Sequence, residues 1–120
     1  MTLDTTFNIL VASDDAALAA AVTSSLRTNG FHVCSAQQCQ NHPPRLIVLD
    51  ADMSAEARAQ LLDPFRAESP RTAPPIVALA ARDSLKATTA EQGVWVCLAK
   101  PIELDSLLSA VDRISRYTAA

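Results

Sequence analysis

Glycine and aromatic residues are scarce in this sequence, with two glycines in 120 residues and an aromatic content of 4%. Two isolated glycines cannot form a glycine-rich phosphate loop, and the sequence contains no Ser-His pair of the kind that hydrolases use. A small flavin-binding or hydrolytic α/β enzyme therefore has no support. No apolar run approaches the roughly 18 residues of a membrane-spanning helix. The net charge is −3 and no basic stripe occurs, which argues against nucleic-acid binding. We therefore expect neither a membrane nor a nucleic acid as a partner of this domain.

Targeting signals and a disulfide framework are also missing. Residues 1–8 lack the basic start and the apolar stretch of a secretory peptide. The three cysteines are an odd number without a disulfide framework, which is typical of a reducing compartment. His32, Cys34, Cys39 and His42 match no standard zinc spacing, and we interpret them as ordinary strand and loop residues. These features predict a cytoplasmic protein.

Short apolar runs alternate with amphipathic segments along the whole chain. Its 120 residues, of which 49% are hydrophobic, are enough to bury a core and predict a single domain at 1–120. The alternation predicts an α/β fold, in which helices cover both faces of a parallel sheet. The expected strands are 7–12, 31–35, 45–50, 76–80 and 94–99, and the expected helices are 16–28, 55–67, 82–92 and 103–117. A proline at position 64 should kink or split the second of these helices.

Three charged residues stand where apolar strands are expected to end. Asp14 follows the run at 9–13, Asp50 ends the strand at 45–50, and Lys100 directly follows the last strand. The carboxyl ends of parallel strands meet at one edge of the sheet, where open α/β folds bind ligands. Two acids and a lysine at such an edge indicate phosphoryl and magnesium chemistry.

These motifs, in their order and spacing, resemble the receiver domain of bacterial two-component response regulators over nearly the whole chain. They are ILVASDD at 9–15, LIVLDADM at 46–53, PIVALA at 75–80 and CLAKP at 97–101. The resemblance implies a flavodoxin-like, doubly wound sheet of five parallel strands in the order 2-1-3-4-5 and a signalling role rather than an enzymatic one. The segment at 36–44 is too short for the usual second helix, which we expect to be shortened or absent.

The resemblance also implies roles for the residues at the expected site. Asp50 corresponds to the phosphoacceptor, and Lys100 would contact the phosphoryl group. Asp14, Asp50 and the backbone carbonyl of Asp52 would bind Mg²⁺. The side chains of Asp15 and Asp52 are expected to be solvated or to act as charges at helix starts. The peptide bond after Lys100 is expected to be cis, as the family usually has it.

The first departure from the family pattern is at the acidic pair after the first strand. When this sequence is aligned with the family pattern at Gly30, Ser13 falls at the first of the two acidic positions and Asp14 at the second. Sliding the pair onto Asp14 and Asp15 would instead lengthen the first strand by a residue and shift its pleat. We prefer the first alignment, which predicts weakened Mg²⁺ binding because one anionic group is gone.

Two further departures fall on the switch positions. Ala80 stands where the family normally has Thr or Ser, and it cannot make the charge-assisted hydrogen bond, worth about 1.5–3 kcal/mol, to a phosphoryl group. Arg82 or Ser84 are candidates to replace that contact. Cys97 stands where the family normally has Tyr or Phe, so a ring that moves inward is missing. Phosphorylation of Asp50 is therefore expected to change the conformation little.

The preferred interpretation is an atypical, partly degenerate receiver domain that acts as a regulatory protein-interaction module, with impaired or absent phospho-switching. The alternative is a conventional phosphoacceptor, phosphorylated on Asp50 by a histidine kinase with Mg²⁺. The expected partners are a histidine kinase, a phosphotransfer protein, a fused output domain or a second copy in a homodimer. Trp95 is either a packing residue or an exposed anchor on the partner face. Both a stand-alone protein and a fragment of a longer regulator fit this sequence.

Overall fold

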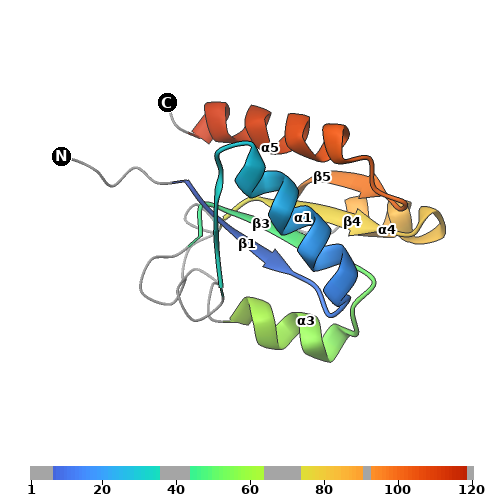
Figure 1. Ribbon diagram of the computed structural model, residues 1–120. Helices are drawn as coiled ribbons and strands as arrows, with labels where there is room; N and C mark the ends of the chain where they lie inside the picture. Colours follow the sequence, from blue (N-terminus) through green and yellow to red (C-terminus); the bar gives the residue numbers. More distant parts are fainter. Residues whose placement is uncertain (1–6, 36–43, 64–73, 91–92, 119–120) are drawn as a thin grey trace.

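A five-stranded parallel sheet forms the centre of the molecule, with its strands in the order β2-β1-β3-β4-β5 (Figure 1). The computed structural model describes residues 7–35, 44–63, 74–90 and 93–118. The strands are β1 (Asn8–Ala12), β2 (His32–Cys34), β3 (Leu46–Asp50), β4 (Ile76–Ala80) and β5 (Val94–Ala99). The helices are α1 (Ala16–Thr28), α3 (Ala55–Leu62), η3 (Arg82–Ser84), α4 (Leu85–Thr89) and α5 (Leu104–Thr118). The fold is the predicted doubly wound α/β architecture with strand order 2-1-3-4-5.

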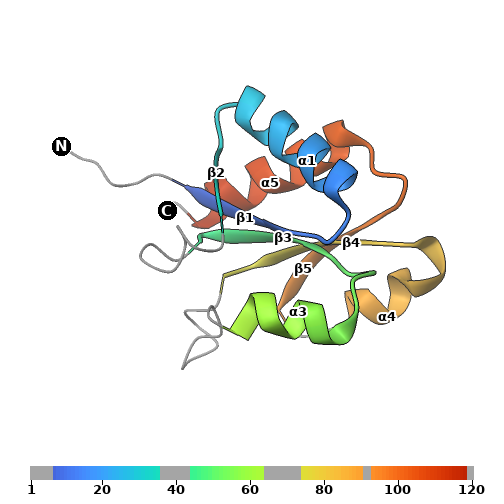
Figure 2. The ribbon, with the colours of Figure 1, turned by 60° about the horizontal axis from the view of Figure 1, so that its bottom comes forward.

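The helices lie on both faces of the sheet. Figure 2 shows α1 and α5 on one face and α3 and α4 on the other. Each face has its own apolar cluster, because successive side chains of a strand point to opposite sides. One cluster brings Val22 and Leu26 of α1 together with Leu107 and Val111 of α5 on the same face of the sheet. The other packs Leu10, Ile47 and Leu49 against Ala57, Leu61 and Leu62 of α3.

The central strand β3 is an uninterrupted apolar run because it is covered on both faces. All five of its residues are buried, and its last residue is Asp50. Asp50 is in register with Leu79 of β4, and Ala80 of β4 is in register with Ala99 of β5. The parallel pairing therefore brings the ends of β3, β4 and β5 to one edge of the sheet, as the sequence predicts.

Local signals at the helix ends explain where α1 and α3 begin and end. Asp15 caps α1 by accepting hydrogen bonds from the amides of Ala17 and Leu18, both at 3.1 Å, so its predicted role at a helix start is confirmed. Gly30 follows α1 with a φ of 89°, a left-handed conformation that glycine adopts without a steric cost. Ser54 caps α3 by accepting a hydrogen bond from the Ala57 amide at 3.1 Å.

Several expected bounds differ from the structure. The helix expected at 55–67 is α3, which ends at Leu62 with Asp63 as its C-cap, before the proline at position 64. The helix expected at 82–92 is divided into η3 and the short α4. The helix expected at 103–117 is α5, and its first residue, Leu104, is 39% exposed.

The shortened second helix falls on 36–43, which lie outside the described residues. Cys34 takes part in a disulfide bond, so the expectation that the cysteines carry none is wrong for this residue. An odd number of cysteines still allows one pair. Within the described ranges, no helix combines the length and the apolar character needed to cross a membrane.

Candidate functional site

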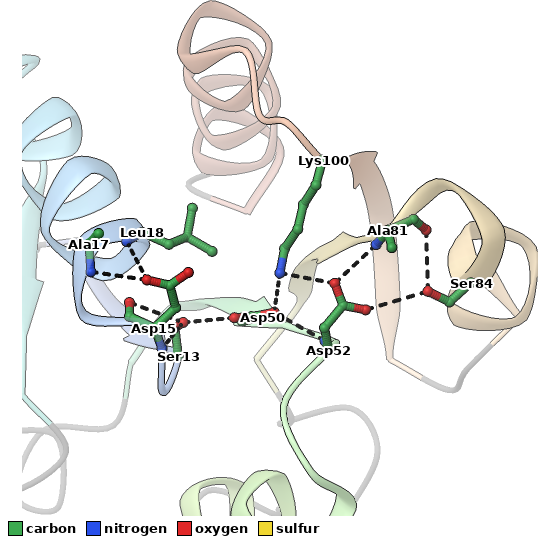
Figure 3. Close-up of polar contacts among 9 residues, drawn as sticks. All are labelled: Ser13, Asp15, Ala17, Leu18, Asp50, Asp52, Ala81, Ser84 and Lys100. Atoms are coloured by element: carbon green, nitrogen blue, oxygen red, sulfur yellow. Dashed lines mark hydrogen bonds and ion pairs between the residues drawn. The ribbon is translucent and has the colours of Figure 1, made fainter.

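Asp50 lies at the carboxyl end of β3, and both of its carboxylate oxygens accept hydrogen bonds (Figure 3). Its side chain is 3% exposed. The Ser13 hydroxyl donates to Oδ2 at 2.8 Å. The Lys100 ammonium donates to Oδ1 at 2.8 Å, and the Asp52 amide donates to the same oxygen at 3.1 Å. Residues from the ends of three strands therefore converge on one buried carboxylate.

The charges at this site determine the protonation of Asp50 and Lys100. Burial by itself would raise the pKa of Asp50, but the hydrogen bonds from Lys100, Ser13 and the Asp52 amide, together with the Lys100 charge, lower it below its usual value. Burial would lower the pKa of Lys100, but hydrogen bonds and charge attraction from Asp50 and Asp52 raise it. Both shifts favour the ionised pair, so Asp50 is a carboxylate and Lys100 an ammonium at neutral pH.

The side chain of Asp52 is exposed, as expected for a solvated charge, and it is also a member of this network, which was not expected. Its Oδ2 accepts from Lys100 Nζ at 2.9 Å and from the Ala81 amide at 3.1 Å. Its Oδ1 lies 3.4 Å from the Ser84 hydroxyl. These contacts arise because the loop after β4, which here includes the short helix η3, folds back over the end of β3 and supplies two donors to Asp52 (Figure 3).

The three residues after β1 have different environments. Ser13 is half-buried, donates to Asp50 and accepts a hydrogen bond from the Asp15 amide at 3.0 Å. Asp14 is exposed, and no hydrogen bond or ion pair within the described residues involves its side chain. Asp15 is the N-cap of α1. The structure therefore brings Ser13, rather than Asp14, into contact with the carboxylate of Asp50.

A magnesium site here would use carboxylate oxygens, which are the ligands that Mg²⁺ prefers. Asp50 and Asp52 supply such oxygens, so the chemistry of the site fits a hard cation. The part of the chain that the structure describes contains no group of three or more His, Cys, Asp or Glu side chains that could hold a metal. The roles of Asp14, Asp50 and the Asp52 carbonyl as Mg²⁺ ligands stay predictions.

The two expected switch positions lie on β4 and β5. Ala80 is fully buried at the end of β4, where its methyl group supplies no hydrogen bond. Cys97 is half-buried in β5 and pairs in register with Ala78. Of the two candidates to replace the missing hydroxyl, Ser84 is the one that reaches the site, through Asp52. Sequence reasoning singled out Ser84 but missed the Ala81 amide, because a backbone donor has no sequence signal.

Trp95 is partly exposed and also packs against a neighbour. Its side chain is 49% exposed, and its ring meets that of Tyr117 edge-on with centroids 5.7 Å apart. Tyr117 is 75% exposed at the end of α5. An open cleft of about 380 Å³ lies between β5 and α5, with Val96 and Leu98 on one side and Ala110 and Arg113 on the other. The surface formed by Trp95, Tyr117 and this cleft is called the β5–α5 face below.

Comparisons with known proteins agree with this geometry. Residues 9–112 match the family model of the response regulator receiver domain. No curated protein shows significant sequence similarity to the chain. A putative response regulator from Chloroflexus aurantiacus is 27% identical with a TM-score of 0.74, and the match covers 92% of this chain and 98% of that one. A receiver protein from Burkholderia phymatum is 18% identical with a TM-score of 0.71, over 90% of this chain and 94% of the other. NtrX from Brucella abortus is 20% identical with a TM-score of 0.72, over 93% of this chain but 26% of its own.

Proposed function

Because this chain belongs to the response regulator receiver domain family, we propose that it is a regulatory receiver domain with impaired phospho-switching, which acts by binding a protein partner. The observation that carries the proposal is the environment of Asp50. Both oxygens of this carboxylate already accept hydrogen bonds, and the residue is buried. A nucleophile in this state has few lone pairs free to attack a phosphodonor.

Weak metal binding is the second part of the proposal. Receiver domains generally bind Mg²⁺ at the acidic site, and the metal neutralises the anionic phosphodonor before it approaches. Here Ser13 donates a hydrogen bond where an acid would supply a negative charge. Asp50, Asp52 and Lys100 together carry a net charge of about −1, since one ammonium is shared by two carboxylates. Mg²⁺ should therefore bind this site more weakly than a site with a further acid beside Asp50.

Loss of the switch contacts is the third part. A phosphoryl group shifts an equilibrium only as far as it contacts the two conformations differently. Ala80 has no hydroxyl to bind the group, and Cys97 has no ring to move. Any adduct on Asp50 would therefore move the rest of the domain little.

The β5–α5 face is the proposed partner surface. Trp95 and Tyr117 form an exposed aromatic pair at the edge of the sheet, and such amphipathic rings are typical of interface centres. The proposed occupants are a histidine kinase, a phosphotransfer protein, a fused output domain or a second copy of the chain. The domain regulates its partner rather than catalysing a reaction. Its proposed location is the cytoplasm, where the disulfide of Cys34 is an unusual feature.

The conventional phosphoacceptor remains the second candidate, since one observation favours it. The pKa of Asp50 is lowered, so the side chain is the ionised carboxylate that a phosphoacceptor must be. Lys100 lies 2.8 Å from it and could move to a phosphoryl oxygen after transfer. In this reading the Ser13 and Lys100 contacts break when Mg²⁺ and a donor bind.

Chemical phosphorylation separates the two candidates. The protein is incubated with Mg²⁺ and acetyl phosphate, and intact mass is followed over time, with Asp50→Asn as the matched control. We expect little or no adduct in the wild type. A stable adduct that is absent from Asp50→Asn would overturn the proposed low reactivity of Asp50 and support the phosphoacceptor.

The partner surface is tested separately by substitution. Sedimentation of the wild type and of Trp95→Ala reports whether a second copy binds through the β5–α5 face. If the wild type dimerises, we expect Trp95→Ala to weaken the dimer at least about tenfold, as loss of an aromatic anchor does. An unchanged dimer constant in Trp95→Ala would place the interface elsewhere.

A further inference from the structure

The Asp52 carboxylate joins three chain segments that are far apart in sequence. Lys100, after β5, donates to Oδ2 at 2.9 Å, and the Ala81 amide, after β4, donates to the same oxygen at 3.1 Å. The Ser84 hydroxyl lies 3.4 Å from Oδ1 and 3.2 Å from the Ala81 carbonyl oxygen, so its proton is shared between them. Figure 3 shows this carboxylate facing Lys100 on one side and the loop of Ala81 and Ser84 on the other.

An ammonium, a backbone amide and a hydroxyl that converge on one point form a donor set for an oxyanion. In this chain the donor set is already filled by an anion from the protein itself. We propose that Asp52 is a built-in anion that holds the loop from Ala81 to Ser84 against the end of β3 without any phosphoryl group. If the loop is already held, it is not available to respond to phosphorylation. This consequence rests on the impaired phospho-switching proposed above.

The contacts of Asp52 do not depend on the charge of Asp50. Lys100 contacts both carboxylates, at 2.8 Å and 2.9 Å, so removing the charge of Asp50 leaves its ammonium paired with Asp52. The Ala81 amide and the Ser84 hydroxyl contact Asp52 without involving Asp50 at all. The loop is therefore held whether Asp50 is free, substituted or modified.

Amide hydrogen exchange at Ala81 measures this attachment directly. The experiment uses the full chain without Mg²⁺ or phosphodonor and compares the wild type, Asp52→Ala and Asp52→Asn by NMR. We expect exchange at Ala81 to be at least about tenfold faster in Asp52→Ala, because the acceptor is gone, with a smaller increase in Asp52→Asn, which keeps one oxygen. Ser84→Ala removes only the shared contact and should change the rate less than Asp52→Ala.

Two nearby amides serve as internal controls in every variant. The Ala51 amide donates to Leu79 O at 2.8 Å, and the Lys100 amide donates to Ala80 O at 2.9 Å. Their exchange should stay unchanged while that of Ala81 rises. An unchanged rate at Ala81 in Asp52→Ala would overturn the proposal. Equal acceleration of all three amides would also overturn it, because Asp52 would then stabilise the whole sheet edge rather than the loop.

Asp50→Asn separates this inference from the proposed function. The substitution should leave exchange at Ala81 within about twofold of the wild type, because Lys100 and the loop keep their contacts with Asp52. A large increase would show that Asp50 holds the loop and would contradict the inference. Adduct formation with acetyl phosphate tests the proposed function alone, since the exchange measurement contains no phosphodonor.

Discussion

Replacing Ser13 with Asp tests how the charge balance around Asp50 limits metal binding. The substitution removes the hydroxyl that donates to Asp50 Oδ2 at 2.8 Å. A hydrogen bond to a charged group contributes about 1.5–3 kcal/mol. A second carboxylate roughly 5 Å from the first adds a repulsion of up to about 3 kcal/mol at an effective dielectric constant of about 20. Because Ser13 is half-buried and partly screened by solvent, we expect a total loss of about 2–4 kcal/mol in the absence of metal.

Magnesium should reverse most of this loss. A cation that binds only the folded state adds about 2.7 kcal/mol to the free energy of unfolding at one hundred times its dissociation constant. The measurement is urea unfolding of the wild type and of Ser13→Asp, in EDTA and at increasing MgCl₂ concentrations. We expect the Ser13→Asp midpoint to rise steeply with Mg²⁺ and the wild-type midpoint to rise much less.

Ser13→Ala is the matched control, because it removes the hydrogen bond without adding a charge. Its stability should fall by about 1–3 kcal/mol and should respond to Mg²⁺ no more than the wild type does. The reasoning is refuted if Ser13→Asp and Ser13→Ala are equally stable in EDTA and gain equally little from Mg²⁺. That result would mean that position 13 does not control the charge available to a metal.

Three further predictions can be checked by urea unfolding. The pKa of Asp50 is lower in the folded state than its unfolded value of 3.8, so the ionised side chain adds to the free energy of unfolding above that pH. This contribution is lost as the pH falls through the folded-state pKa. The stability of Asp50→Asn should therefore decline less steeply than that of the wild type below about pH 4, because the variant has no carboxylate to protonate at this position. Asp15→Ala should cost about 1 kcal/mol through the lost helix cap, whereas Asp14→Ala should stay within about 0.5 kcal/mol; equal losses would contradict the capping role. Leu107→Ala should cost about 2–5 kcal/mol because this side chain is fully buried, whereas Leu104→Ala, at an exposed position, should cost under about 1 kcal/mol; similar costs would place the core elsewhere.

The elements with local signals could be predicted from the sequence. β3 is a continuous apolar run because a central parallel strand is buried on both faces. Asp15 and Gly30 mark the two ends of α1, since a carboxylate caps amides and glycine adopts a positive φ. The expected cis bond after Lys100 is present as well. At the two ends of α1 the residue acts on its own neighbours along the chain, whereas the cis bond was expected from the resemblance to the family.

The environment of Asp52 could not be predicted in this way. Its side chain follows a strand in a polar segment, which is typical of a solvated charge. Whether it pairs depends on the path of the loop around Ala81, 29 residues away, and on the position of Lys100 across the sheet edge. The exposure of Asp14 and the hydrogen bond from Ser13 to Asp50 also depend on side-chain directions that adjacent residues in the sequence do not reveal.

The sequence separations within the site have a consequence for folding. Ser13 and Asp50 are 37 residues apart, and Lys100 and Asp50 are 50 residues apart. Closing such long loops costs entropy that a single hydrogen bond does not offset, so these contacts form only after the strands have paired. A chain that lacked its last strand and helix would have no Lys100 to neutralise the two carboxylates. The contact between Lys100 and Asp50 therefore reports a completed domain, and it cannot stabilise a chain in which β5 has not yet paired.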